Sequence, residues 1–449
     1  MSRITLAGVV SFILILSTSR AAERPPVMGR NGAVSAGHPL TTAAAFEILT
    51  KGGNAFDAGV AALLAGGVVE QDLYSLGGEG LVLVYPRSEG KVTSIVGQGW
   101  APRGATIDWY KSRNKTLDGE GLDPAVIPGT LHAALTVLEK WGTMSFEQVS
   151  ARAIDYASNG FPLRPRTATA IEGNLKFFQK WPDNQHYWLK PDGTMYKPGE
   201  TVKLPTLAHT LTLMVEAERA AAAKGRAAGI GAARDRFYKG DIAAEMVRFL
   251  KQHQAPFELD DFAEFFAKIE EPATTNYRGY QIYKHSFGSQ GPVLLEALNI
   301  LEQFDLKSMK RNSADYIHTV IEALKLAYAD RDTYYGDPAF VQTPAEGLLS
   351  KDYAKQRAAL INPRRASRSF IAGNPLPFDS KVKEWKYWVA NITEASKPGQ
   401  PAPNAEPIRG TIKDTTHIAI ADKAGNVFDS TPSGGWIAAP SFLGIPALA

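Results

Sequence analysis

The chain lacks cysteine altogether, so a disulfide framework, a thiolate metal site, an iron–sulfur cluster and a thiol nucleophile are excluded. Its eight histidines never fall at metal-ligand spacing, and no metal or cofactor is predicted. The 49 basic and 46 acidic residues give a net charge of +3, and no basic block is long enough to indicate a nucleic-acid surface. No apolar run reaches the roughly 20 residues that span a bilayer. Any covalent catalysis must therefore use an oxygen or an amine.

The first 21 residues have the three parts of a secretory signal peptide. A basic start at Arg3 precedes an apolar stretch from Ile4 to Leu16, and small residues follow up to Ala21. A membrane anchor or an unstructured tail is the alternative interpretation. The pattern predicts export to the periplasm or the medium, with cleavage after Ala21.

The whole chain is 44% hydrophobic. The sequence after residue 21 mixes strand and helix patterns, which predicts an α/β (α+β) protein. Strands are expected within 28–37, 81–85, 92–96, 277–283, 416–421 and 427–431, and helices over 40–50, 55–65, 145–159, 207–223, 243–252, 292–301 and 313–330. A stretch rich in alanine, glycine and arginine, 220–234, is expected to be a mobile surface connection. Proline-punctuated residues 361–413 are expected to form a long flexible segment.

The sharpest chemical signal, Asp414-Thr415-Thr416-His417, follows that segment and precedes a predicted strand. A threonine hydroxyl is a poor nucleophile unless a base lies beside it. If the chain were cut between Asp414 and Thr415, the new α-amino group, with a pKa of about 7.7–8.0, could serve as that base. The alternative is an ordinary threonine-rich start of a strand.

A series of motifs from about Gly37 to Gly435 resembles the γ-glutamyltransferase (γ-glutamyltranspeptidase, glutathione hydrolase) family. The motifs are His38-Pro39-Leu40, Gly52-Gly53-Asn54-Ala55-Phe56-Asp57-Ala58, Ser75-Leu76-Gly77-Gly78-Glu79-Gly80, Pro128-Gly129, Phe237-Tyr238-Lys239-Gly240, Tyr277-Arg278-Gly279-Tyr280, Glu322-Ala323-Leu324, Ala329-Asp330-Arg331-Asp332, Gly336-Asp337-Pro338, Asp414-Thr415-Thr416-His417 and Gly425-Asn426. Each is weak alone, but their order over most of the chain is specific.

The resemblance implies an N-terminal-nucleophile hydrolase, an αββα four-layer sandwich made as one precursor that cuts itself at Asp414-Thr415. Residues 22–414 would form the large subunit, and the small subunit would start at 415. Thr415 would then attack the γ-glutamyl amide of glutathione or a related compound and pass the acyl group to water, an amino acid or a peptide. In the family a second hydroxyl holds the nucleophile, and Thr431 and Ser433 occupy that stretch, with Ser433 the better match.

The sequence also departs from the family pattern. Gln98 stands where glutathione-cleaving members have an arginine that binds the substrate carboxylate, and losing that charge should cost about tenfold to a hundredfold in affinity. Gly435 replaces an asparagine expected to hold the glutamyl group. Gly77-Gly78 with Glu79 replaces a longer glycine run of the family, and tight backbone packing is the expected role of this stretch.

Only residues 415–449 follow the predicted cut, so we expect a sandwich incomplete at the C-terminus, truncated early in the small subunit. Two alternatives to a γ-glutamyl enzyme therefore stay open. One is an acylase of the same superfamily acting on another amide, and the other is a non-catalytic truncated remnant.

Overall fold

A computed structural model describes residues 29–115, 117, 121–369, 371–385, 415–434, 441–442 and 445–446. The predicted signal peptide, Asp414 and Gly435 lie outside these described residues. Within them, no helix has both the length and the apolar character needed to cross a bilayer.

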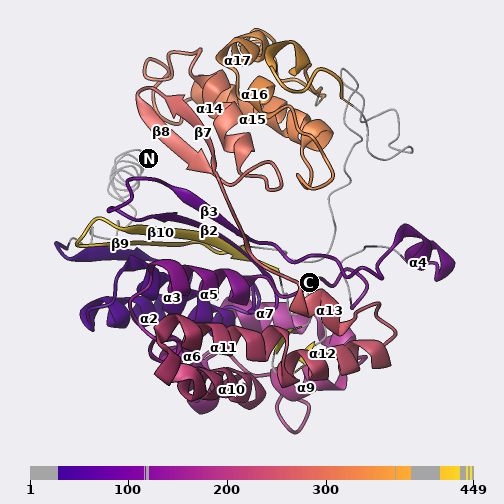
Figure 1. The fold of residues 1–449 in the computed structure, drawn as a ribbon. Coiled ribbons are helices and arrows are strands. Elements are labelled where there is room, and N and C mark those ends of the chain that lie inside the picture. The colour runs from indigo at the N-terminus through magenta and orange to yellow at the C-terminus, as the bar shows by residue number, and fades with distance from the viewer. Residues whose placement is uncertain are drawn as a thin grey trace, which may run out of the picture.

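A six-stranded sheet of strand order β1-β9-β10-β2-β3-β6 forms the centre of the molecule (Figure 1). Its neighbouring strands are all antiparallel, and β9 and β10, from the end of the chain, are inserted between β1 and β2. The strands are β1 (Gly32–Ser35), β2 (Glu79–Tyr85), β3 (Thr93–Gly97), β6 (Lys268–Glu270), β9 (Ile418–Asp422) and β10 (Val427–Ser433). The strands predicted within 81–85 and 92–96 pair as the hairpin β2–β3, and those within 416–421 and 427–431 pair as the hairpin β9–β10.

A layer of helices covers one face of this sheet (Figure 1). It contains α2 (Pro39–Thr50), α3 (Ala55–Val69), α5 (Thr130–Trp141), α6 (Phe146–Asn159), α10 (Pro205–Ala221) and α11 (Arg226–Tyr238). Smaller elements within residues 107–263 and at the end of the chain are α4 (Ile107–Ser112), α7 (Pro165–Gly173), α8 (Leu175–Phe178), α9 (Pro182–Trp188), α12 (Asp241–Gln252), α13 (Leu259–Ala263), η1 (Ala222–Lys224), the strand pair β4 (Phe161–Pro162) and β5 (Thr201–Val202), and the pair β11 (Ser441–Phe442) and β12 (Ile445–Pro446).

Every residue of α3 is buried, because its small side chains let the helix lie close to the sheet. A Cβ added at Gly59 would come within 2.3 Å of the Phe428 ring on β10. The predicted end of this helix at Gly66-Gly67 is wrong, since the helix continues to Val69. The Tyr74 hydroxyl occupies the space that a side chain at Gly66 would need, so these glycines serve packing rather than helix termination.

The predicted mobile connection at 220–234 is also wrong, because most of it belongs to helix α11. Ile230 and Phe237 are buried against the helix layer. Arg226 donates to the backbone carbonyl of Leu138 at 3.0 Å and to that of Glu139 at 2.9 Å. Alanine and arginine are good helix formers, and this propensity with burial outweighs the glycines.

A second lobe lies over the other face of the sheet (Figure 1). It contains the hairpin β7 (Ala273–Tyr277) and β8 (Tyr280–Lys284), with α14 (Pro292–Leu301), α15 (Ala314–Tyr334), α16 (Ala345–Leu348), α17 (Lys351–Ala358) and η2 (Leu376–Phe378). The layers therefore run helix, sheet, sheet, helix, as expected, and the second sheet has two strands among the described residues.

The single strand predicted over 277–283 is in fact the turn and second half of that hairpin. Arg278 and Gly279 form its two-residue loop, with φ values of +52° and +89°. Positive φ at both central positions is typical of a type I′ turn, which reverses tightly paired strands. Apolar alternation alone did not reveal this reversal.

The first part of the predicted flexible segment 361–413 is held in place by contacts. Gly373 donates its backbone N–H to Asp330 at 2.7 Å, and Tyr334 donates to the Gly373 carbonyl at 2.8 Å. The buried Asp379 carboxylate accepts the backbone N–H groups of Gly347 and Val382. The expectation is therefore wrong as far as residue 385, and residues 386–413 lie outside the described part of the chain.

Two buried histidines make the fold sensitive to acid. Burial lowers the pKa of His132 to about 4 and that of His285 to about 3, from 6.5 for a free imidazole. Each histidine is protonated in the unfolded chain at a higher pH than in the folded protein. The free energy of unfolding is therefore highest above pH 6.5 and decreases as the pH falls. We expect each of the two histidines to lower the unfolding free energy by roughly 2–3 kcal/mol at pH 4.5.

Urea unfolding at pH 7 and pH 4.5 measures this loss. His285→Gln can keep the hydrogen bond to Ser94 (2.8 Å), which joins the two lobes, but it cannot titrate. The variant should lose less stability than the parent between these pH values. An identical loss in both proteins would contradict the assignment.

Candidate active site

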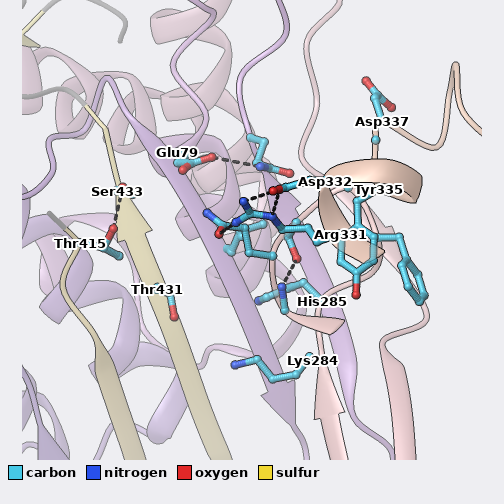
Figure 2. A pocket seen from close by; sticks show the side chains of 18 residues that line it. Glu79, Lys284, His285, Arg331, Asp332, Tyr335, Asp337, Thr415, Thr431 and Ser433 are labelled. Atoms are coloured by element: carbon cyan, nitrogen blue, oxygen red, sulfur yellow. Dashed lines mark hydrogen bonds and ion pairs between the residues drawn. The ribbon is translucent and has the colours of Figure 1, made fainter. Parts of the chain in front are cut away.

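The β9–β10 hairpin brings Thr415 and Ser433 together, although 18 residues separate them. Ile418 pairs with Ser430, and the Thr416 backbone N–H reaches the Pro432 carbonyl at 3.4 Å, so the pairing extends toward Thr415. The Thr415 Oγ1 and Ser433 Oγ atoms lie 3.0 Å apart. The exposed Thr415 hydroxyl is thus held at one end of β10, as Figure 2 shows.

These two hydroxyls open into a cavity of about 660 Å³ between the central sheet and the second lobe (Figure 2). Its polar lining side chains come from both sides, namely Glu79, Gln98, Thr415, Thr431 and Ser433 from the sheet side and Lys284, His285, Ser289, Gln290, Arg331, Asp332, Tyr335 and Asp337 from the second lobe. Gln98, Thr415, Thr431 and Ser433 are the predicted site residues that the structure describes. All four line the sheet side of this one cavity.

Thr431 and Ser433 play different parts in this arrangement. Both line the cavity, but the Thr431 hydroxyl makes no hydrogen bond to any described residue, whereas the Ser433 hydroxyl contacts Thr415. Ser433 is therefore the better placed of the two to hold the Thr415 hydroxyl. Thr431 faces the cavity but makes no hydrogen bond to Thr415.

Neither nearby histidine is suited to activate Thr415. His417, the last residue of the predicted motif, pairs with Asp429 at 2.8 Å and does not line the cavity. His285 does line it, but burial lowers its pKa to about 3 and its Nδ1 contacts Ser94. Because an imidazole with that pKa is a weak base near neutral pH, the α-amine of a freed Thr415 is the better candidate.

A buried polar cluster holds Thr416, the residue next to Thr415. The Glu70 carboxylate accepts the hydroxyl of Thr416 at 3.2 Å and that of Thr41 at 2.7 Å. Arg164 lies 3.7 Å from the same carboxylate. Burial raises the pKa of Glu70, and the arginine and the hydroxyls only partly offset this effect. The cluster fixes the residue that follows Thr415.

Gly37 completes this support because no side chain fits there. A Cβ at Gly37 would lie 2.1 Å from Thr416 Oγ1 and 2.4 Å from a Glu70 oxygen. The sequence analysis named Gly37 only as the approximate start of the family resemblance and did not identify Glu70. The hydrogen bond between Glu70 and Thr416 joins residues 346 positions apart, and no local sequence pattern indicates it.

Gln98 lies in the cavity as the sequence suggested, but it contacts a carboxylate. Its Nε2 donates to Glu79 Oε2 at 3.1 Å. The described residues hold no group of three or more metal-binding side chains. The polar lining of the cavity is made of hydroxyls, carboxylates, amides, two cations and the His285 imidazole. Such a set is suited to acyl transfer through a hydroxyl nucleophile.

Comparison with known proteins agrees with this geometry. The family model described as gamma-glutamyltranspeptidase matches residues 41–437. A glutathione hydrolase proenzyme of Bacillus subtilis strain 168 is 30% identical, with 95% of this chain and 70% of that protein covered. An acylase ACY 1 proenzyme of Pseudomonas sp. strain SE83 is also 30% identical, with 91% and 66% covered.

A solved structure shares the fold as well. The crystal structure of Helicobacter pylori gamma-glutamyltranspeptidase has a TM-score of 0.69 and 28% identity, with 77% of this chain and 95% of that chain covered. The chain spans between 61% and 70% of the length of the curated relatives that it matches.

Proposed function

Because the chain belongs to the gamma-glutamyltranspeptidase family, a family of enzymes, we propose that it hydrolyses or transfers γ-glutamyl groups through an acyl-enzyme on Thr415. The observation that carries this proposal is the Thr415–Ser433 hydroxyl pair, 3.0 Å apart, at a cavity of about 660 Å³. A cavity of that size is in the range that takes small substrates.

The proposed activation is a self-cleavage at Asp414-Thr415. Thr415 Oγ attacks the carbonyl carbon of Asp414, an ester bond forms, the peptide C–N bond breaks, and the hydroxyl proton ends on the new amine. Water then hydrolyses the ester and leaves the Asp414 carboxylate and a free Thr415 hydroxyl. The products are a large subunit ending at 414 and a small subunit starting at 415, both from one precursor.

The freed amine gives Thr415 its own base. It removes the hydroxyl proton as Oγ attacks the γ-glutamyl amide of glutathione or a related compound, and it returns that proton to the leaving amine. Ser433 holds the attacking oxygen in place. Water, or the amine of an amino acid or peptide, then attacks the acyl-threonine ester and regenerates the enzyme.

We further propose that residues 1–21 direct the precursor to the periplasm or the medium and are removed there. The basic start, apolar stretch and small residues before the cut support this location. The mass of the mature large subunit tests it.

An acylase activity on another amide is the second candidate, and the Gln98–Glu79 contact favours it. The γ-glutamyl group carries a carboxylate that an arginine would bind, and Gln98 offers this carboxylate an uncharged amide instead. An acylase proenzyme is also among the similar proteins.

Turnover of γ-glutamyl anilide and glutaryl anilide by the purified protein separates the candidates. The proposed function predicts a kcat/KM about tenfold or more higher for the γ-glutamyl compound, because only its acyl group carries the amine of a glutamyl group. A preference for the glutaryl compound would favour the acylase. No cleavage and no turnover of either would indicate a non-catalytic remnant.

A further inference from the structure

Glu79 lies in the same row of side chains as the nucleophile's partner. In the β10–β2 pairing it is directly opposite Ser433, and opposite residues of an antiparallel pair present their side chains on one face of the sheet. Gln98 follows the end of β3, the next strand, and donates to Glu79. Ser433, Glu79 and Gln98 therefore form consecutive positions along one wall of the cavity. Figure 2 shows Ser433 and Glu79 on neighbouring strands beside Thr415.

The Glu79 carboxylate keeps capacity to bind a ligand. Oε2 accepts the Gln98 amide, whereas Oε1 has no hydrogen bond within the described part of the chain. No described cation forms an ion pair with Glu79 either, although the residue lines the cavity and is partly accessible. A carboxylate in a cavity without a cationic partner favours a positively charged or N–H-donating ligand group.

The cations of the cavity stand on the opposite wall. Lys284 at the end of β8 and Arg331 on α15 extend into the cavity from the second lobe (Figure 2). Arg331 is already bonded to Asp332 at 2.8 Å and to Gln290, while Lys284 has no ion pair among the described residues. The second-lobe wall also carries Asp332 and Asp337, so of its two cations Lys284 is the one without a carboxylate partner among the described residues. A substrate carboxylate would be repelled from the wall beside Thr415, where Glu79 lies.

We propose that Glu79, oriented by Gln98, is a specificity-determining residue that binds an ammonium group on the acyl part of the substrate. The substrate class is an amide whose acyl group carries an amine and does not need a carboxylate beside Thr415. This inference rests on the proposed function, since the acyl group is defined by its bond to Thr415. A carboxylate bound beside Glu79 would be repelled and an ammonium attracted, so the preference for the ammonium should be about tenfold or more.

Three anilides test the proposal by their kcat/KM values. The α-amide of γ-glutamyl anilide has an ammonium and no carboxylate, γ-glutamyl anilide has both, and glutaryl anilide has only the carboxylate. The wild-type enzyme should prefer them in that order. Glu79→Gln, which keeps the size and the hydrogen bonding, should reduce the ratio between the first and the last by about tenfold or more.

Asp337→Asn is the matched control, because it removes the same charge from the opposite wall of the same cavity. A direct contact at Glu79 predicts that the control leaves the ratio within about twofold of wild type. Equal changes in both variants, or a wild-type enzyme that turns over glutaryl anilide as well as the α-amide, would overturn the proposal.

Calorimetric titration keeps the inference separable from the proposed catalysis. L-Glutaminamide carries an ammonium and no carboxylate, and glutaramic acid carries a carboxylate and no ammonium. Even a chain that does not cut itself should bind the former about tenfold or more tightly, and Glu79→Gln should remove that difference. Equal affinities, or no binding of either compound, would overturn the role of Glu79, whereas cleavage at Thr415 is scored independently on a gel.

Discussion

Thr415→Ala should leave the polypeptide uncut and lower the turnover of γ-glutamyl anilide by about 10⁴-fold or more. The substitution removes the oxygen that we propose attacks Asp414 and later the substrate, so both steps should fail for one reason. Denaturing gels and the anilide assay measure the two losses. Thr415→Ser keeps a hydroxyl and should still be cut.

Thr431→Val is the matched control for this prediction. It also replaces a cavity-lining threonine, but the Thr431 hydroxyl makes no hydrogen bond to a described residue. We expect this variant to be cut and to stay within about tenfold of wild-type turnover. Cleavage of the Thr415→Ala chain at the same peptide bond would show that Thr415 is not the nucleophile.

Glu70→Ala should destabilise the fold and slow the self-cleavage together. The change leaves the buried hydroxyls of Thr41 and Thr416 without their acceptor and Arg164 with one fewer carboxylate nearby. Removing one partner from a buried charged cluster typically costs 3–5 kcal/mol, and we expect about 3 kcal/mol because Asp72 still pairs with Arg164 at 2.7 Å. Urea unfolding of the uncut Thr415→Ala background measures the stability alone.

Glu70→Gln separates the geometry of this cluster from its charge. Because burial raises the pKa of Glu70, its contribution to stability is present at low pH and is lost as the pH rises through that pKa, opposite to the histidines. The neutral glutamine has no ionisation cost and should lose less stability at pH 7 than the alanine variant. Wild-type stability and a wild-type cleavage rate in Glu70→Ala would contradict the supporting role of the cluster.

The part of the site that lies on the β9–β10 hairpin could be predicted from sequence. Strand patterns on both sides of a turn place Thr415 near Ser433 once the strands pair, and the resemblance indicates which hydroxyls matter. The contact of 3.0 Å agrees with that prediction. Gly435 and Asp414 remain predictions, because the structure does not describe them.

The supporting residues could not be predicted because they act across long separations. Glu70 ends α3 and reaches Thr416 only after β9 enters the sheet between β1 and β10. Gly78 packs against the backbone of Ser433 and Gly434, as expected for its glycine run. Its neighbour Glu79 gains its place beside Ser433 from the β10–β2 register, which the sequence pattern does not fix. In the same way, α11 depends on burial against α10, and the β7–β8 turn depends on backbone φ values that the alternation of side chains does not encode.

Mass spectrometry with N-terminal sequencing of the purified, incubated protein tests the central claim most directly. If Thr415 is an N-terminal nucleophile, the preparation contains one fragment that begins at Thr415 and another that ends at Asp414, and turnover of the anilide rises as these fragments accumulate. An unbroken Asp414–Thr415 bond after prolonged incubation, with or without anilide turnover, would contradict the account.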